Sequence, residues 1–472
     1  MFTTETPARA SAEAPTADDI AALARQLQGE VILPDDPNFL EARRLHGLST
    51  ARPAVIVRPA SAADVAATIT FARERHIELA VHSGGHSLAH YSVVAGGVVL
   101  DLTLMKAISI DTERRTARLE AGLTWGEVAA ALHPHGLGLT AGDTASVGVG
   151  GLTRGGGIGW FARKYGLTID HVRSIEVVTA DGEIVTASAQ EHPDLFWALR
   201  GGGGNFGVAT AFEVDLHPAG TVYGGAIFYA ASEAASVLPA YARYAATAPE
   251  ELTTMALIMP APPAPFISPA MHGKPILALT MVYSGDFAEG NRVVDPLRRL
   301  ATPVADVVGP MPYPAMFEFT KEATRFDQRQ YARSVMVDTV DDALISALLS
   351  RGLDLPSRGA LLELRILGGA MRRGWGDGGA FAQRDKGGLV MAVAYGYEEA
   401  DTVRHHAWVD RYYEAMRSFG SGAYVGFMMR DDEARAGEVY PPATLERLRQ
   451  VKQRYDPTNV FHHNLNIEPA GE

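Results

Sequence analysis

Residues 81–87 read Val-His-Ser-Gly-Gly-His-Ser, and the rest of the chain is interpreted outward from this stretch. It begins in the short apolar run 79–81, which is typical of a buried strand. Two adjacent glycines let the backbone turn through conformations that other residues avoid. Successive N–H groups in such a turn form a concave site for an anion such as a phosphate. The residues expected to contact a bound ligand here are Ser83, Gly84, Gly85, His86 and Ser87.

Two further glycine clusters follow in the same half of the chain. The second occupies residues 148–151 and 155–159, and the third runs from 201 to 204 and ends in Asn-Phe-Gly at 205–207. Three such turns indicate a long, phosphate-bearing ligand rather than one small metabolite. The positions expected to contact it are Gly148, Gly150, Gly151, Gly156, Gly157, Gly159, Gly207 and Val208.

The order of these motifs resembles that of a known family. Val-Gly-Val-Gly-Gly begins at Val147, Gly-Gly-Gly-Asn-Phe-Gly ends at Gly207, and the tail reads Tyr-Asp-Pro-Thr-Asn-Val-Phe at 455–461 and Asn-Leu-Asn-Ile at 464–467. This set is similar to the FAD-linked oxidases of the vanillyl-alcohol-oxidase (PCMH-type) superfamily. Within it, the chain resembles the berberine-bridge-enzyme-like group and its bacterial 6-hydroxy-D-nicotine-oxidase-like members. The resemblance implies FAD as cofactor, with Asn464 and Asn466 at the flavin or active site.

The expected fold class is α+β. The resemblance implies a two-lobed, PCMH-type FAD-binding domain over residues 1–218, an inserted substrate-binding domain over 219–421, and a C-terminal segment, 422–472, that returns to the first domain. The residues agree with this division, because the spacing predicts a βαβ unit across 54–81. An Asp-Gly hairpin is predicted at 181–182. Beyond residue 218 the spacing predicts strands at 225–229, 255–259, 276–282, 361–367 and 389–394 and helices at 233–246, 341–350 and 401–418. We expect these elements to form a mainly antiparallel sheet covered by helices.

Composition excludes several classes of protein. A formal net charge of −13 argues against a nucleic-acid partner. The absence of cysteine excludes disulfides, thiolate metal sites and cysteine nucleophiles. Neither a signal peptide nor an apolar run of membrane-spanning length is visible, so we expect a cytoplasmic protein with no membrane partner. The sequence leaves open whether the chain is a monomer or a homodimer.

Two competing motifs are weaker. Residues 157–162 fit the dinucleotide pattern Gly-x-Gly-x-x-Ala, but glycines rather than an apolar strand precede them, and Asp181 falls in a predicted turn. The pairs at 405–406 and 462–463 are both His-His, but adjacent residues on a helix point in different directions. We therefore expect no metal site, and no Gly-x-Ser-x-Gly motif supports a hydrolase.

The resemblance also implies how the flavin is held. The histidine at the position of His86 is bonded to the flavin 8α-methyl group in the family. Many relatives add a second bond from a cysteine, whose place is taken here by Thr144. Single covalent attachment through His86 is therefore expected. Three residues after Thr144, Val147 matches a position that borders the flavin face where dioxygen arrives in relatives.

The residue that accepts the substrate's proton departs from the family pattern. Relatives carry a Tyr-x-Asn-Tyr strand facing the flavin, but here the stretch reads Tyr424-Val-Gly-Phe427, so the second tyrosine is missing. The leading candidate is Glu363, with Tyr424 in reserve because strand alternation would place it opposite Phe427. Alternation also puts Glu363 and Arg365 on one face of a strand. Burial would raise the pKa of Glu363 and Arg365 would lower it. The alternative is a solvated Glu–Arg pair on the outer face of the sheet.

The resemblance implies an oxidase that works in two half-reactions. A small organic substrate (an alcohol, an amine or a secondary metabolite) gives a hydride to the flavin, and dioxygen reoxidises the flavin and yields hydrogen peroxide. Single attachment leans away from oligosaccharides. The alternatives are a dehydrogenase with another electron acceptor and a flavoprotein that binds a small molecule without turnover.

Overall fold

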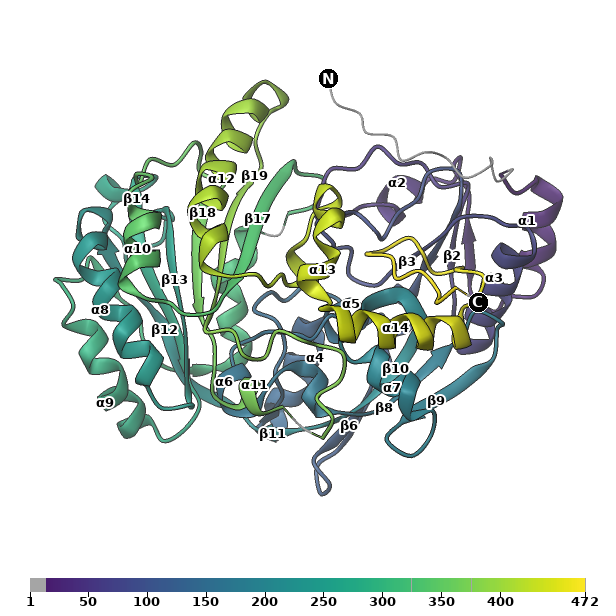
Figure 1. Cartoon of the computed structure of the whole chain (residues 1–472), viewed down its shortest axis with the longest axis horizontal. Coiled ribbons are helices and arrows are strands. Elements are labelled where there is room, and N and C mark those ends of the chain that lie inside the picture. Colours follow the sequence, from purple (N-terminus) through teal and green to yellow (C-terminus); the bar gives the residue numbers. More distant parts are fainter. Residues whose placement is uncertain (1–13, 324, 375, 472) are drawn as a thin grey trace.

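The computed structural model describes residues 14–323, 325–374 and 376–471. Figure 1 shows two lobes side by side, one built on an eight-stranded sheet and the other on two smaller sheets. We call the part that carries the two smaller sheets, residues 30–215, the glycine lobe. Within the described ranges, no helix combines the length and the apolar character that crossing a membrane requires.

The first small sheet contains the predicted βαβ unit. Its strand order is β1 (Glu30–Ile32), β2 (Val55–Arg58), β4 (Val98–Asp101) and β3 (Leu79–His82), and both β2 and β3 run parallel to β4. Helix α3 (Ala62–Glu74) connects β2 to β3, and the Ser61 hydroxyl accepts from the Asp64 N–H at 3.3 Å. Strand β3 ends at His82, so the first glycine turn follows a carboxyl strand end, where ligands collect in such units.

The second small sheet is antiparallel, in the order β5 (Ile108–Asp111), β6 (Thr116–Glu120), β10 (Val208–Asp215), β8 (Val172–Val178) and β9 (Ile184–Ser188). The hairpin predicted at Asp181 joins β8 to β9, and Gly182 has a φ of +88°. Asp181 is therefore a turn residue and not the ribose-binding acid of a dinucleotide fold. Besides α3, the lobe's helices are α2 (Phe39–Ala42), α4 (Trp125–Leu132), α5 (Val149–Arg154), α6 (Ala162–Tyr165) and α7 (Pro193–Leu199), and α1 (Ala17–Ala24) precedes the lobe. A short pair, β7 (Leu137–Gly138) with β11 (His217–Pro218), ends this part of the chain.

The eight-stranded sheet is antiparallel throughout. Its order is β15 (Ala305–Asp306), β12 (Thr221–Ala230), β14 (Pro275–Tyr283), β13 (Leu252–Pro260), β18 (Ala360–Ile366), β19 (Gly388–Tyr395) and β17 (Gln330–Val337), and β16 (Gly309–Pro312) also pairs with β12. The sequence did not predict β17, whose alternation is interrupted by Arg333 and Ser334. Helices α8 (Ala234–Thr247), α9 (Phe287–Arg298), α10 (Asp342–Leu349) and α12 (Thr402–Met416) accompany this sheet, and α11 (Ala370–Arg373) follows β18.

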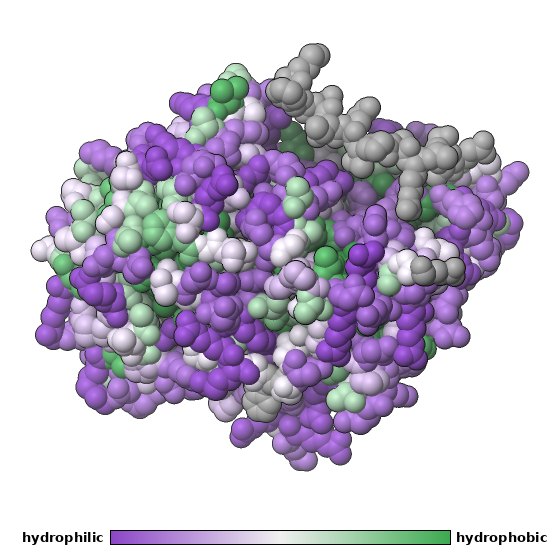
Figure 2. Space-filling model, in the orientation of Figure 1, coloured by the Kyte–Doolittle hydropathy of each residue, from purple (hydrophilic) through white to green (hydrophobic). Residues whose placement is uncertain are grey.

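The two faces of this sheet pack against different partners. Leu362, Leu364 and Ile366 of β18 share one buried cluster with residues of α8, α10 and α12. On the other face, residues of β17 and β19 pack with Ile158 and Leu167 of the glycine lobe. The sheet is therefore covered by helices on one side and by the glycine lobe on the other. Figure 2 shows a mainly hydrophilic surface, with apolar side chains visible between the helices that cover the sheet.

The C-terminal segment packs against the glycine lobe. Helix α13 (Ala436–Val439) precedes α14 (Pro442–Tyr455), which crosses that lobe (Figure 1). The Lys452 ammonium lies 2.6 Å from the Asp456 carboxylate, and neither side chain is exposed. The same ammonium donates to the carbonyl oxygen of Asn205 at 2.8 Å. The third glycine cluster and the tail are thus held together.

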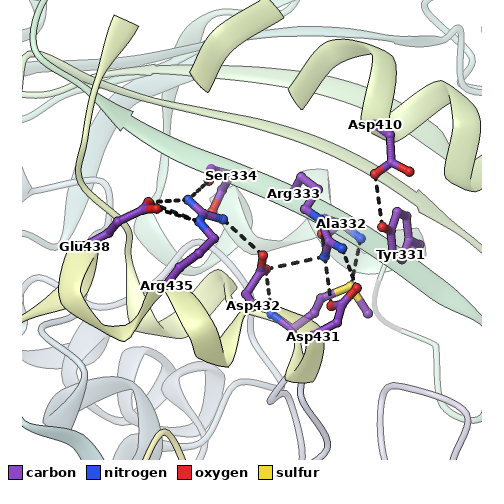
Figure 3. Close-up of polar contacts among 10 residues, drawn as sticks. Tyr331, Ala332, Arg333, Ser334, Asp410, Asp431, Asp432, Arg435 and Glu438 are labelled. Carbon is purple, nitrogen blue, oxygen red and sulfur yellow. Dashed lines mark hydrogen bonds and ion pairs between the residues drawn. The ribbon is translucent and has the colours of Figure 1, made fainter. Parts of the chain in front are cut away.

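A network of charged side chains joins β17 to the C-terminal segment (Figure 3). Arg333 of β17 donates to Asp431 at 3.0 Å and to Asp432 at 3.4 Å. Arg435 bonds to Asp432 at 3.1 Å and to Glu438 at 2.7 Å. We call these five residues the β17 clamp. The clamp fixes the sheet edge against the segment that begins just after Tyr424.

Candidate active site

The first and second glycine clusters are in direct backbone contact. A Cβ added at Gly84 would lie 2.2 Å from the backbone nitrogen of Gly148, and one added at Gly148 would lie 2.3 Å from Ser83 Oγ. The Ser83 hydroxyl donates to the carbonyl oxygen of Ala121 at 2.7 Å. Any side chain at Gly84 or Gly148 would push the two turns apart. The first and second glycine motifs therefore pack together.

Arg154 joins the second cluster to the third. Its guanidinium donates to the carbonyl oxygen of Gly207 at 2.8 Å and to that of Gly150 at 3.3 Å. The side chain is buried, and desolvation lowers the pKa of Arg154 to about 10. Sequence reasoning missed this residue; the available signal was a lone arginine between two runs of glycine.

The predicted glycines differ in what surrounds them. A Cβ at Gly156 would meet the Phe381 ring at 2.6 Å, at Gly157 it would meet Thr168 at 2.1 Å, and at Gly159 it would meet the Ala141 carbonyl oxygen at 1.3 Å. These three positions require glycine because protein atoms fill the space. Gly151 differs, because nothing lies within 4 Å of its Cβ position. Gly151 is therefore the predicted position with open space beside it.

The other residues predicted to contact the ligand differ in burial and in hydrogen bonding. Val208 begins β10 and its side chain is fully buried in the core, so only its backbone can face a ligand. Ser87 is half-buried in the first turn. Asn464 donates to the carbonyl oxygen of Phe461 at 3.0 Å, and its buried Oδ1 has no partner within the described part of the chain. Asn466 is exposed between two buried residues.

His86 lies against the segment that carries Thr144. The His86 Nε2 atom is 2.9 Å from Ser146 Oγ. Burial, followed by the charges of His46 and His82, lowers the pKa of His86 well below its usual value. The imidazole is therefore neutral. Thr144 donates from its hydroxyl to Asp143 at 3.1 Å, and its carbonyl oxygen accepts from the N–H of Val147 at 3.3 Å. His86, Thr144 and the half-buried Val147 thus lie in one region, as predicted.

Glu363 and Arg365 face the glycine lobe. Their side chains contact each other, and Arg365 Nη2 lies 2.6 Å from Asp143 Oδ2, with all three side chains largely buried. The outer-face alternative is wrong, because helices cover the opposite face and the alternating leucines occupy it. Burial is the largest cause that raises the pKa of Glu363, Asp143 adds to the rise, and Arg365 opposes it. Burial therefore decides the competition that the sequence left open.

Tyr424 is placed differently from the prediction. The residues after it, Val425–Phe427, form a 3-10 helix rather than a strand, so alternation does not apply. The Tyr424 hydroxyl accepts from the N–H of Gly157 at 3.3 Å, and burial raises the pKa of Tyr424. Tyr424 therefore points at the second glycine cluster and not away from it. Phe427 packs edge-on against Tyr424, and the Arg365 guanidinium lies 5.3 Å from the Phe427 ring centroid.

A small cavity of about 20 Å³ adjoins Arg365. Asp143, Trp160, Thr253 and Arg365 lie on its wall. Trp160 Nε1 and Thr253 Oγ1 are buried without a hydrogen-bond partner among the residues described. A buried donor with no partner is costly, so these groups are suited to a polar small molecule or water. For metals, the described ranges contain no cluster of three or more His, Cys, Asp or Glu residues that could bind an ion.

Comparison with known proteins identifies the fold and cofactor class. A family model described as an FAD binding domain matches residues 53–188, and one described as berberine and berberine like matches residues 423–468. (R)-6-Hydroxynicotine oxidase of Paenarthrobacter nicotinovorans is 32% identical over 461 residues, which cover 94% of this chain and 98% of that protein. The chain belongs to the FAD-linked, berberine-bridge-enzyme-like oxidoreductases.

Solved structures of this family share the fold. The structure of 6-hydroxy-D-nicotine oxidase from Arthrobacter nicotinovorans has a TM-score of 0.82 and 28% identity, covering 94% of this chain and 98% of that one. BBE-like 28 from Arabidopsis thaliana has a TM-score of 0.83 and 25% identity, covering 96% of this chain and all of that one. The fold class predicted from sequence is confirmed: a PCMH-type α+β oxidoreductase.

The residues of this chain fit FAD. The packed first and second glycine turns and the open side of Gly151 lie within the residues that the FAD-binding family model matches. The buried Oδ1 of Asn464, which has no partner among the described residues, lies within those that the berberine-like model matches. FAD is therefore the cofactor of this oxidoreductase.

Proposed function

We propose that this chain is an FAD-dependent oxidase for a small organic alcohol, amine or secondary metabolite. Residues 1–218 and 422–472 would hold the flavin, and residues 219–421 would contact the substrate. The observation that carries the proposal is the buried cluster of Glu363, Arg365 and Asp143, which faces the glycine lobe beside the loop that contacts His86. When bound, FAD accepts a hydride from the substrate and passes two electrons to dioxygen, which yields hydrogen peroxide.

Glu363 is the group that takes the substrate's proton. A general base works best when its pKa lies near the working pH, and burial moves the pKa of Glu363 upward in that direction. Arg365 holds the Glu363 carboxylate in one orientation through Nε, while Asp143 contacts Nη2 of the same guanidinium. Tyr424 contributes by supporting the backbone of Gly157. Phe427, where relatives carry a tyrosine, cannot exchange a proton.

His86 holds the flavin by one covalent bond. Its half-buried, neutral ring has a nitrogen lone pair with which to form that bond, and the cysteine-free chain offers no second attachment. The flavin should stay with the chain after acid denaturation, and His86→Ala should release it and slow turnover. Wild-type protein that releases all its FAD into the acid supernatant contradicts covalent attachment.

Val147 borders the path of dioxygen. Its half-buried side chain lies in the loop that begins beside Thr144, close to His86. Val147→Leu should slow reoxidation of the reduced flavin and leave substrate-driven reduction largely intact. Unchanged oxygen kinetics in that variant would refute this role.

The function itself is tested by mixing the holoenzyme anaerobically with alcohols, hydroxylated alkaloids, amines and polyketides. Bleaching of the flavin identifies a substrate, and hydrogen peroxide released on adding air identifies an oxidase. Bleaching with slow return in air, but rapid return with a quinone, would indicate a dehydrogenase. Binding of a compound without bleaching would indicate a protein that does not turn it over.

A further inference from the structure

Three aromatic rings form a continuous stack that ends on the proposed flavin-linking histidine. The ring centroids of His86 and His46 are 3.5 Å apart with an interplanar angle of 22°, and those of His46 and Phe326 are 4.2 Å apart at 30°. His46 is buried, whereas Phe326 is partly exposed at the outer end of the stack. The Arg44 guanidinium lies 4.7 Å from the Phe326 ring centroid. The rings come from three separate segments of the chain.

The stack is fixed by contacts on both sides of His46. The N–H of His46 donates to the carbonyl oxygen of Gly85 at 3.1 Å, within the first glycine turn. On the outer side, the Asp327 N–H donates to the Leu45 carbonyl oxygen at 2.9 Å. Arg44 and Asp327 form an ion pair at 2.7 Å. The His46 ring is therefore held between the turn that carries His86 and the segment that leads into β17.

The edge of the His86 ring is fixed as well. Its Nε2 atom lies 2.9 Å from Ser146 Oγ, so one nitrogen is engaged by the second glycine segment and the other, Nδ1, is not part of that contact. In a neutral imidazole one nitrogen carries hydrogen and the other a lone pair. If Nε2 carries the hydrogen and donates it to Ser146, the lone pair is on Nδ1. The hydrogen bond made by one ring nitrogen therefore decides which nitrogen keeps the lone pair and can react.

We propose that Ser146 and His46 are positioning residues for covalent flavin attachment: Ser146 selects Nδ1 of His86 as the bonding atom, and the His46 ring fixes the plane of the imidazole. This inference depends on the covalent attachment proposed above. The low pKa of His86 supports it, because a protonated imidazole has no lone pair.

The attachment step balances with dioxygen as the oxidant. His86 Nδ1 forms a bond to the carbon of the flavin 8α-methyl group, and that carbon loses one C–H bond. The Nε2–H bond also breaks, which leaves a neutral substituted imidazole. The two electrons and two protons released reduce one dioxygen to hydrogen peroxide. The Ser146 hydroxyl contacts the nitrogen that loses its proton, so it can pass that proton onward.

The test measures flavin that stays with the chain after acid denaturation. Wild-type holoenzyme is compared with Ser146→Ala, Ser146→Thr, His46→Ala and His46→Phe, each purified with FAD and incubated in air and under nitrogen. We expect Ser146→Ala to attach flavin at least tenfold more slowly, while Ser146→Thr, which keeps the hydroxyl, restores most of the rate. His46→Ala should also attach slowly, whereas His46→Phe, which keeps a flat ring, should approach the wild type. Under nitrogen the attached flavin should stay reduced, because dioxygen is then not present to take up the two electrons.

Noncovalent FAD affinity, measured by quenching of flavin fluorescence, separates positioning from loss of binding. The proposal requires that Ser146→Ala and His46→Ala bind FAD within about threefold of one another and of His86→Ala. Attachment in Ser146→Ala at the wild-type rate overturns the role of Ser146, and equal rates in His46→Ala and wild type overturn that of His46. If a variant attaches flavin slowly only because it binds FAD weakly, the positioning role of that residue is also overturned. Release of all FAD by the wild type instead defeats covalent attachment itself, and this inference with it.

Discussion

Two clusters of charged residues connect the eight-stranded sheet to other parts of the chain, and they differ in their access to water. The active-site cluster joins Glu363 and Arg365 to Asp143, with side-chain exposures of 8%, 8% and 16%. The β17 clamp joins Arg333 and Arg435 to three carboxylates, of which Asp431 is 54% and Glu438 36% exposed. Both clusters contain one more carboxylate than guanidinium groups, so they carry similar net charge.

The comparison shows that burial, rather than composition, makes a carboxylate chemically useful. In the active-site cluster desolvation raises the pKa of Glu363, because water cannot stabilise the charge and Arg365 is shared with Asp143. In the clamp, solvent screens the outer carboxylates, and exposed ion pairs contribute little free energy. The first arrangement suits proton transfer, and the second suits holding two segments together.

The largest expected effect is on flavin reduction. Glu363→Gln removes the proposed base and should lower the rate of flavin reduction by at least tenfold, within the range of about 10²–10⁴ that a well-placed base contributes. Tyr424→Phe should lower it less, because the hydroxyl supports Gly157 and does not transfer the proton. Anaerobic stopped-flow absorbance measures both rates, with flavin still attached.

The matched control is Glu438→Gln, which makes the same change in the clamp and should leave reduction unchanged. Near-normal reduction by Glu363→Gln across the pH range would show that the active-site cluster, too, is only structural.

A smaller effect is expected on the pH dependence. Glu363 accepts a proton only when it is ionised, so the reduction rate should rise with pH through its pKa. Asp143→Asn removes a charge that raises this pKa and leaves Arg365 wholly to Glu363. Both consequences of Asp143→Asn lower the pKa of Glu363, so the increase in reduction rate should occur at lower pH. The charged or titratable groups nearby are Arg365, Asp143, Tyr424, Tyr313 and Arg163.

The reduction rate at saturating substrate, measured over a pH series, tests this shift. Asp431→Asn in the clamp should leave the profile where it is in the wild type. A profile that stays in place in Asp143→Asn, or moves to higher pH, would contradict the coupling between Asp143 and Glu363.

The smallest expected effects are on stability alone. Arg333→Gln removes charge-assisted hydrogen bonds from a largely buried side chain, so the free energy of unfolding should fall by about 1–3 kcal/mol. Asp431→Asn removes an exposed partner and should cost only about 0–1 kcal/mol. Urea unfolding followed by circular dichroism measures both. Flavin reduction at saturating substrate should be unchanged in either variant, and a tenfold loss in Arg333→Gln would show that the clamp also shapes the active site.

Much of the fold could be predicted from local patterns. The βαβ unit, the hairpin at Asp181 and strands β13, β14, β18 and β19 follow from residue spacing, and the structure contains each of them. Strand β17 was missed because Arg333 and Ser334 interrupt its alternation. Helix α9 was missed as well; Gly290 and Pro296 lie inside it, and both residues are unfavourable in a helix interior. The 3-10 helix after Tyr424 was expected as a strand by resemblance, although Gly426 weakens strand propensity there.

By itself, the sequence determined where the three glycine turns lie and that Glu363 and Arg365 share a face of a strand. Both conclusions rest on short-range geometry: the freedom of glycine and the period of two along a strand. Only the tertiary structure decided which face is buried, by packing helices against the leucines of β18. It also brought Asp143, Ser146 and Arg154 to their partners. Desolvation and contacts between distant segments depend on what packs against a residue, and no local pattern contains that information.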